Sequence, residues 1–232
     1  MSSFFDIGYV FEAIPKLLSY LHITIEILVL SIFFGLILGI IIAVPRLYKI
    51  PVLKQIATLY ISFIRGTPIL IQLFLIFYGL PFIVGMIGID ITRMDAFIFV
   101  VITYTLSNAA AFAEIFRAAI QSVDYGQAEA AQSIGMTGWQ TFSRIVFPQA
   151  LRVAFPNIAS TSISSLKDTS LAFSIGVMDM MGRGDTLITA TMNALEVYVA
   201  LAIIYYVIVL LLEYGYKFIE RYLNRYLVKE AI

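Results

Sequence analysis

Charged and hydrogen-bonding side chains interrupt stretches of this chain that are otherwise strongly apolar. The residues concerned are Asn108, Glu114, Ser160, Ser164, Lys167 and Asp168. Ionisable groups are costly inside a bilayer, and they usually face a helix-bundle interior or a water-filled cavity. We therefore interpret these residues first as a path for a polar or charged solute, and only second as structural.

Glu114 has two possible roles. Ser107, Ala111, Glu114 and Ala118 recur at helical spacing and would share one narrow polar face. Glu114 could pair with a ligand ammonium or guanidinium group, or it could form a structural ion pair with Arg117 one turn away. Asn108, at the edge of this face, could likewise bond either a helix or a ligand.

The segment "FPNIASTSISSLKDTS" is too polar to face lipid, and Pro156 removes one of its backbone hydrogen bonds. We place Ser160, Ser164, Lys167 and Asp168 along or beside the path. The alternative is an external loop around a Lys167–Asp168 pair.

The segment "RGTPILIQ", residues 65–72, adds Thr67 and Gln72 to the predicted path. It predicts a chain break at 66–68, followed by a helix whose first N–H groups could meet a carboxylate. Arg65 could instead lie at the cytoplasmic headgroups. With Lys167 as the only basic residue near Glu114 and Asp168, the path would be acidic and would slightly favour a cationic solute. A neutral polar solute stays possible through Asn108, Gln72 and the serines.

The amino-acid composition indicates which kind of secondary structure holds these residues in place. The chain is 61% hydrophobic and 13% charged, with a mean hydropathy of +0.94, which is far outside the range of soluble domains. We predict an all-α membrane protein, because a crossing helix needs about 20 mostly apolar residues. The five predicted spans cover about 18–44, 57–84 (interrupted at 65–68), 95–117, 150–177 (broken at Pro156) and 195–217.

Lys and Arg predict the orientation, since they accumulate on the cytoplasmic side. One set of loops and ends carries Arg46, Lys49, Lys54, Arg117, Arg144, Arg152, Lys217, Arg221, Arg225 and Lys229, whereas the other carries Lys16, Arg93, Lys167 and Arg183. The N-terminus is therefore predicted outside and the C-terminus in the cytoplasm.

Several functions are disfavoured by what the chain lacks. There is no cysteine, and His22 is the only histidine, so a metal site is improbable. The balance of 15 Lys and Arg against 15 Asp and Glu indicates no nucleic-acid partner. No phosphate-binding G-x-x-x-x-G-K-[ST] loop occurs, so energy from ATP would have to come from another chain.

The loop at about 118–149 contains a polar segment of small residues. Residues 127–134 predict a short helix, and Gly135 stands where a left-handed residue would end it. Trp139, Phe142, Ile145 and Phe147 would hold this helix against the membrane. An amphipathic helix lying at the membrane surface is the alternative.

The pattern Glu129-Ala130-Ala131, Gly135, Ile145 and Pro148 resembles the EAA motif of permease subunits of bacterial ABC importers, with Phe147 replacing the usual Leu. The stretches "FIRGTPILIQLFLIFYGLP", "AAAFAEIFRAAIQSV" and "SSLKDTSLAFSIG" are similar to the polar amino-acid uptake branch of that family. The resemblance covers nearly the whole chain from about residue 20.

The resemblance implies a type I importer permease fold and a location in the bacterial inner membrane. It also implies two ATPase subunits that bind ATP and Mg, a second permease subunit (identical or related), an extracytoplasmic solute-binding protein and an amino-acid substrate. Among amino acids, the predicted acidic path slightly favours a basic one, and glutamine or another polar amino acid stays possible. The helix with Glu129, Ala130, Ala131 and Gly135 would couple to the ATPase subunit.

We accordingly interpret residues 1–232 as one transmembrane permease domain with no enzymatic activity, cofactor or metal of its own. A gradient-driven secondary transporter is the main alternative, although it would need no docking helix. A membrane-embedded enzyme would need a nucleophile–base pair or metal ligands, which the sequence does not offer.

Overall fold

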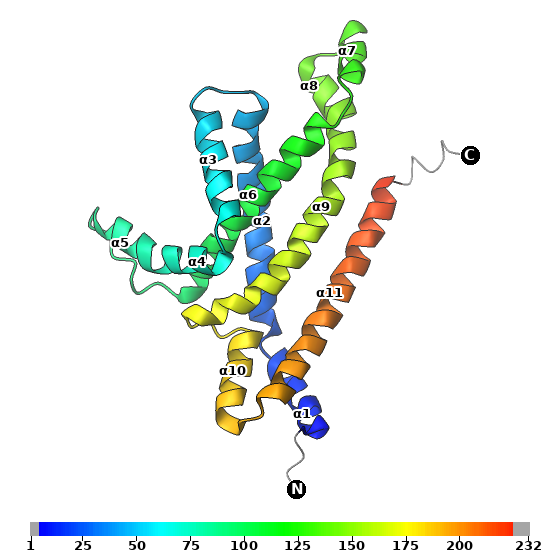
Figure 1. Cartoon of the computed structure of the whole chain (residues 1–232). Helices are drawn as coiled ribbons and strands as arrows, with labels where there is room; N and C mark the ends of the chain where they lie inside the picture. Colours follow the sequence, from blue (N-terminus) through cyan, green and yellow to red (C-terminus); the bar gives the residue numbers. More distant parts are fainter. Residues whose placement is uncertain (1–4, 225–232) are drawn as a thin grey trace.

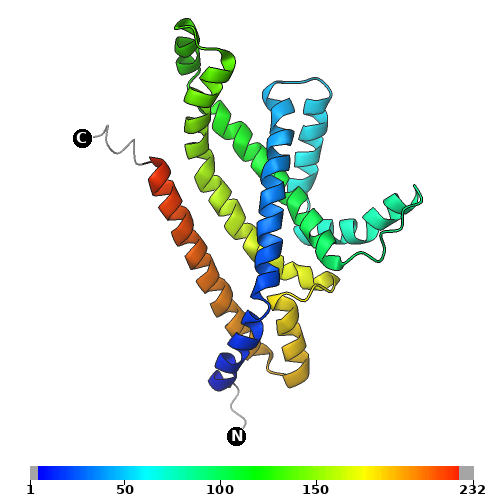
Figure 2. The ribbon, with the colours of Figure 1, turned by 180° about the vertical axis from the view of Figure 1, so that it is seen from behind.

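The computed structural model describes residues 5–224, and every regular element within them is a helix. Figures 1 and 2 show long helices lying alongside one another, with α1 and α10 at one end of the molecule and α7 and α8 at the other. The α-helices are α1 (Ile7–Leu18), α2 (Leu21–Leu47), α3 (Leu53–Gly66), α4 (Ile69–Phe74), α5 (Leu80–Gly85), α6 (Ala96–Gln121), α7 (Tyr125–Ser133), α8 (Gly138–Thr141), α9 (Phe147–Asp168), α10 (Met180–Thr191) and α11 (Ala194–Asn224). The π-helical turns η1 (Leu75–Gly79) and η2 (Phe142–Val146) and the 3₁₀ turn η3 (Thr169–Ile175) connect them.

The predicted all-α membrane architecture is confirmed. Helices α2, α6 and α11 are each long and apolar enough to cross a membrane. If the bent pair formed by α3 and residues 69–85 is counted as one further span, the described residues contain four. Helix α9 has 22 residues, but its Ser, Thr and Asn content keeps it out of this apolar group. Helices α1 and α10 were not predicted from the sequence.

The second predicted span is not one straight helix. The axes of α3 and of residues 69–85 differ by 113°. Thr67 is extended (φ −118°, ψ 142°) before Pro68, because a residue preceding proline is pushed out of the helical region. The predicted break at 66–68 is confirmed, and its consequence is a sharp change of chain direction.

The prediction that Pro156 breaks the fourth span is wrong. Helix α9 runs continuously from Phe147 through Pro156 to Asp168. Proline removes only one backbone hydrogen bond, whereas ending the helix at membrane depth would leave several more backbone groups unsatisfied. The chain then tightens into η3, so the α-helix ends before the predicted limit of 177.

Close packing of α2 against α6 forms the centre of the molecule. A Cβ added at Gly35 would lie 2.8 Å from the Asn108 Cβ, and one added at Gly39 would lie 2.8 Å from the Phe112 Cβ. Ser31 and Ala43, on the same face of α2, are also buried. Small residues every fourth position thus let two backbones approach within one chain.

A second core forms at the end of the molecule that holds α1 and α10. Leu17, Met180, Val197 and Leu201 are buried there together, from α1, α10 and α11. These contacts join the first and last helices of the described chain.

The α2–α3 connection and the α7–α8 segment lie at one end of the molecule, toward which α11 also runs (Figure 1). Arg46, Lys49, Lys54 and Arg144 belong to this end. Arg225 and Lys229, used in the orientation argument, lie outside the described residues. The arrangement agrees with basic residues gathering at one end, and the side of the membrane on which that end lies stays a prediction.

Candidate functional site

One side of α9 carries a row of exposed polar residues. Asn157, Ser160, Ser164 and Lys167 are all exposed at helical spacing, whereas Ser162 and Ser165 are buried. A polar face on a helix among membrane spans is unfavourable against lipid, so it faces water or protein. Three predicted path residues, Ser160, Ser164 and Lys167, therefore share one surface. Solute passage along that surface stays a prediction.

Asp168 ends α9 beside this face and is partly buried. The Tyr104 hydroxyl donates a 2.7 Å hydrogen bond to the Asp168 backbone carbonyl. This bond ties the last turn of α9 to α6. Asp168 is therefore held in position next to Lys167 on the exposed face.

Asn108 lies away from any exposed surface. It is 4% exposed, its Oδ1 accepts a hydrogen bond from the Ser165 hydroxyl, and its Nδ2 lies 3.4 Å from the Ser31 Oγ. The Asn108 side chain thus connects α2, α6 and α9. Its polar atoms are occupied within the chain, in line with the structural alternative.

Gln72 and Thr67 stabilise the bend between α3 and α4. The Gln72 Nε2 donates to the Ile64 carbonyl at 2.7 Å and to the Thr67 carbonyl at 3.0 Å. The Thr67 hydroxyl donates to the Phe63 carbonyl at 3.0 Å. These bonds satisfy carbonyl groups that the end of α3 leaves without helical partners. Gln72 is 5% exposed and therefore holds the corner instead of facing a path in this conformation.

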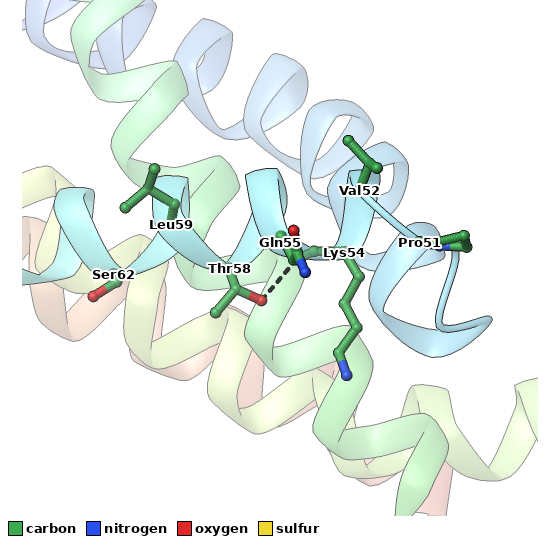
Figure 3. A pocket seen from close by; sticks show the side chains of 7 residues that line it. All are labelled: Pro51, Val52, Lys54, Gln55, Thr58, Leu59 and Ser62. Atoms are coloured by element: carbon green, nitrogen blue, oxygen red, sulfur yellow. Dashed lines mark hydrogen bonds between the residues drawn. The ribbon is translucent and has the colours of Figure 1, made fainter.

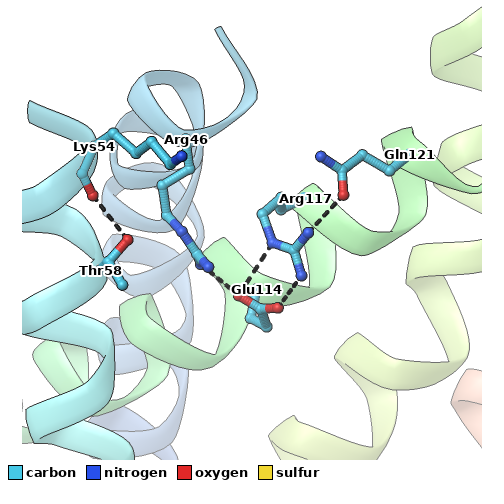
Figure 4. A network of polar contacts seen from close by, with 6 residues as sticks. All are labelled: Arg46, Lys54, Thr58, Glu114, Arg117 and Gln121. Atoms are coloured by element: carbon cyan, nitrogen blue, oxygen red, sulfur yellow. Dashed lines mark hydrogen bonds and ion pairs between the residues drawn. The ribbon is translucent and has the colours of Figure 1, made fainter. Parts of the chain in front are cut away.

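Two arginines surround the Glu114 carboxylate (Figure 4). Arg46 donates to Glu114 Oε2 from the end of α2, and Arg117 donates to both carboxylate oxygens. Arg117 also donates to the Gln121 side-chain oxygen at 2.5 Å. The Glu114 side chain is 25% exposed. The group carries one negative and two positive charges.

The assumption that Lys167 is the only basic residue near the carboxylates is therefore wrong for Glu114. The contact between α2 and α6 brings Arg46 to a carboxylate 68 positions later in the sequence. Arg46 was interpreted from the sequence only as a marker of orientation, and no residue close to it in the sequence indicates this partner. The ion pair with Arg117, which helical spacing did indicate, is present.

The predicted coupling segment forms a short helix, α7, that ends as expected. Gly135 has φ +91°, so the left-handed turn predicted there is confirmed. The Asp124 side chain caps the start of α7 by accepting from the Gly126 N–H at 2.8 Å. Ala131 is buried, whereas Glu129 and Ala130 are exposed. Glu129 and Ala130 are therefore free to contact another protein.

The chain after Gly135 is well defined by local bonds. Thr137 and Gln140 form a reciprocal capping box at the start of α8, with bonds of 2.9 and 3.3 Å. Both residues precede the turn η2, which leads directly into α9. The α8 helix is thus joined to α9 through η2 without an intervening loop.

An apolar cavity of about 660 Å³ lies between this segment and the ends of α2, α6 and α9. Its lining includes Leu47, Phe116, Ala128, Phe142 and Val146. The segment therefore does not pack tightly against the spans over its whole length.

The aromatic side chains of this segment differ from the prediction in one respect. Trp139 is 74% exposed and so contributes little to holding the segment. Its ring centroid lies 6.1 Å from that of Phe142, which in turn lies 5.9 Å from that of Phe147. Tyr125 and Ile134 are also strongly exposed. Large apolar residues thus remain uncovered at this end of the chain.

Asp179 was not predicted from the sequence. This residue is fully buried and caps α10, with Oδ1 accepting from the Gly182 N–H at 2.9 Å. An Asp three residues before Gly182 is a weak capping signal, and the short length of α10 concealed it. Within the described part of the chain, no three acidic or histidine side chains gather where a metal ion could bind.

Projecting α7, the interrupted second span and the polar face of α9 together agree with a transport subunit. Residues 35–225 match the family described as "Binding-protein-dependent transport system inner membrane component". The chain belongs to this family, and the predicted relationship to ABC importer permeases is confirmed.

Individual relatives are similar over nearly their full length. The chain is 55% identical over 225 residues to the L-cystine transport system permease protein TcyL of Bacillus subtilis (strain 168), covering 97% of this chain and 94% of the relative. It is 33% identical over 217 residues to the glutamine transport system permease protein GlnP of Escherichia coli (strain K12), covering 94% of this chain and 97% of the relative.

Solved structures confirm the fold. A chain from "Crystal structure of an amino acid ABC transporter with histidines" superposes with a TM-score of 0.83 at 33% identity, covering 95% of this chain and 99% of the other. A chain of the MetNI methionine ABC transporter superposes with a TM-score of 0.73 at 20% identity, covering 89% of this chain and 95% of the other. At this low identity the similarity supports the fold alone.

Proposed function

We propose that this chain is the transmembrane subunit of an ATP-driven amino-acid importer in a bacterial inner membrane. The observation that carries the proposal is the α7 segment, which ends at Gly135 and exposes Glu129 and Ala130 beyond the spans. Such a slim projecting helix suits docking into a groove of a separate ATPase subunit. Family membership supports the same interpretation.

In this proposal the chain performs no covalent chemistry and holds no cofactor. ATP and Mg²⁺ bind to the ATPase subunits, whose closure moves α7. The continuous connection from α8 through η2 into α9 carries that movement to the polar face of α9. A second permease subunit, identical or related, completes the path, and an extracytoplasmic binding protein delivers the solute.

L-Cystine is our first candidate substrate, because an L-cystine permease protein is 55% identical to this chain. A basic amino acid is the second candidate. Its support from Glu114 is weaker than the sequence indicated, because two arginines already neutralise that carboxylate. Asp168 beside the α9 face remains as an acidic group. Glutamine is the third candidate, from a 33% identical relative.

The test is uptake by proteoliposomes that contain the full complex with its binding protein. Radiolabelled L-cystine, L-arginine and L-glutamine are supplied outside, with ATP inside and no ion gradient. We expect uptake of at least one amino acid, and none when a non-hydrolysable ATP analogue replaces ATP. Uptake that follows an imposed proton or sodium gradient without ATP would instead identify a secondary transporter.

A further inference from the structure

Arg65 is a charged residue whose role the fold leaves unexplained. It lies in the last turn of α3 and is exposed. Among residues 5–224 its guanidinium group has neither an ion-pair nor a hydrogen-bond partner. The other arginines near this part of the chain, Arg46 and Arg117, are both paired with Glu114.

The length of α3 places Arg65 well away from the membrane surface at which this helix would start. Helix α3 begins at Leu53, directly after the connection that follows α2. Twelve residues separate Leu53 from Arg65, which corresponds to about 18 Å at 1.5 Å per residue. The hydrocarbon core is about 30 Å thick. With α3 starting at the membrane surface, Arg65 would lie near the middle of the bilayer, beyond the reach of an extended arginine side chain from that surface.

A hydrogen bond sets the level of α3 relative to α6. The Tyr60 hydroxyl of α3 donates to the Leu106 carbonyl at 2.6 Å. Leu106 lies near the middle of α6, which covers Ala96–Gln121. Helices α3 and α6 run in opposite directions (Figure 1), so Arg65, five residues after Tyr60, lies closer to the start of α6 than Leu106 does.

The surface of α3 that leads to Arg65 is also polar. Figure 3 shows Lys54, Thr58 and Ser62 in a row along one side of the helix, beside a shallow groove of about 520 Å³. Arg65 follows Ser62 by three residues and continues this row. An arginine at the bilayer centre costs about 3 kcal/mol or more against lipid. This side of α3 therefore faces water or protein.

We propose that Arg65 binds the carboxylate of the amino acid in transit. A guanidinium group matches a carboxylate through two parallel hydrogen bonds. The adjacent Gly66 leaves space, since no heavy atom lies within 4 Å of a Cβ added there. The bend held by Gln72 keeps the end of α3 in place. This inference rests on the proposed function and adds the group that recognises the part common to all amino acids.

The test measures binding of free ligands to the complete permease–ATPase complex in nanodiscs, without the binding protein, so that only selectivity of the complex itself is measured. The probes are L-cystine, L-arginine and L-glutamine, each compared with its methyl ester. In the unaltered complex, we expect the transported amino acid to bind more tightly than its ester. Arg65→Gln should weaken binding of the acid about 10- to 100-fold, in line with loss of a charged hydrogen bond, and should leave binding of the ester unchanged. Arg65→Lys should fall between the two.

Lys54→Gln is the matched control, because it removes a positive charge from the same row near the other end of α3 and should change neither affinity. An Arg65→Gln complex that still prefers the acid over the ester overturns the proposal. So does an Arg65→Gln complex whose two permease subunits separate in native mass spectrometry, since Arg65 would then pair with the other subunit. Failure of the unaltered complex to take up any amino acid would instead reject the proposed function.

Discussion

Two guanidinium groups share the Glu114 carboxylate, and this arrangement decides how the residue is interpreted. Arg46 comes from α2, and Arg117 lies one turn later on α6. Both carboxylate oxygens accept hydrogen bonds from arginine. A cationic substrate would have to displace an arginine to reach Glu114 in this conformation. The structural role therefore gains support relative to the ligand role.

Glu114→Gln tests this role. The amide keeps one acceptor oxygen but removes the negative charge, so the two guanidinium groups lose their counter-charge. We expect the free energy of unfolding to fall by about 1–3 kcal/mol, the range for hydrogen bonds to charged groups, measured by thermal unfolding in detergent. The ratio of basic to neutral amino-acid uptake should not change.

Glu213→Gln is the control for that experiment. Glu213 pairs with Lys217 on α11 at 3.5 Å, and both side chains are well exposed. Such pairs contribute little, so the expected change is below about 0.5 kcal/mol. A selective loss of basic amino-acid uptake in Glu114→Gln, with unchanged stability, would show that Glu114 contacts the substrate.

At the scale of elements, α9 combines two surfaces. Ser162 and Ser165 face the interior, and Ser165 bonds Asn108 of α6. Ser160 and Ser164 are exposed on the other side. Because the natural chain contains no cysteine, single cysteines can report on each surface without background.

Ser164→Cys and Ser162→Cys form a matched pair. A thiol reacts as its thiolate, which needs water. We therefore expect a water-soluble methanethiosulfonate reagent to label Ser164→Cys in the assembled complex and to leave Ser162→Cys unlabelled. Equal protection of both cysteines would mean that another protein chain, and not a water-filled path, covers the exposed face of α9.

Helix α7 depends on the left-handed residue that ends it. Gly135→Val places a β-branched residue at φ +91°, which costs about 1–2 kcal/mol. We expect a distorted segment, weaker association with the ATPase subunit and reduced uptake, while the amount of protein in the membrane stays the same. Co-purification and uptake measure these effects.

Gly138→Ala is the companion variant, since no heavy atom would approach a Cβ at that position and its φ is not left-handed. It should behave like the unaltered chain. Full uptake in Gly135→Val would indicate that this turn is not part of the coupling element.

At the scale of the whole molecule, the alternation of the long helices places the α7–α8 segment and the α2–α3 connection at the same end (Figure 2). Helices α1 and α10 occupy the opposite end. Basic residues of the α2–α3 and α7–α9 regions therefore lie together at the end of the molecule that we predict to be cytoplasmic. The cytoplasmic location of this end is the prediction that labelling can decide.

Cysteines at Gln132 and Ile87 test the orientation. Both positions are exposed, the first on α7 and the second in the connection before α6. In intact cells, Gln132→Cys should react only with a membrane-permeant maleimide, and Ile87→Cys also with an impermeant one. The reverse labelling pattern would overturn the orientation derived from Lys and Arg.

Local sequence features determined much of this architecture. The apolar lengths of α2, α6 and α11, the break before Pro68 and the turn at Gly135 were predicted from residues within one element. Each depends on transfer to lipid or on backbone geometry, which neighbouring residues specify.

Tertiary structure decided which surfaces meet. The four small residues on α2 pack against α6 of the same chain, and this contact brings Arg46 to Glu114. Burial of Asn108 and exposure of Ser164 also follow from packing. These outcomes depend on contacts between residues far apart in the sequence. A helical repeat in the sequence predicts that residues of one kind share a face of a helix. Only the tertiary structure shows which other residues pack against that face.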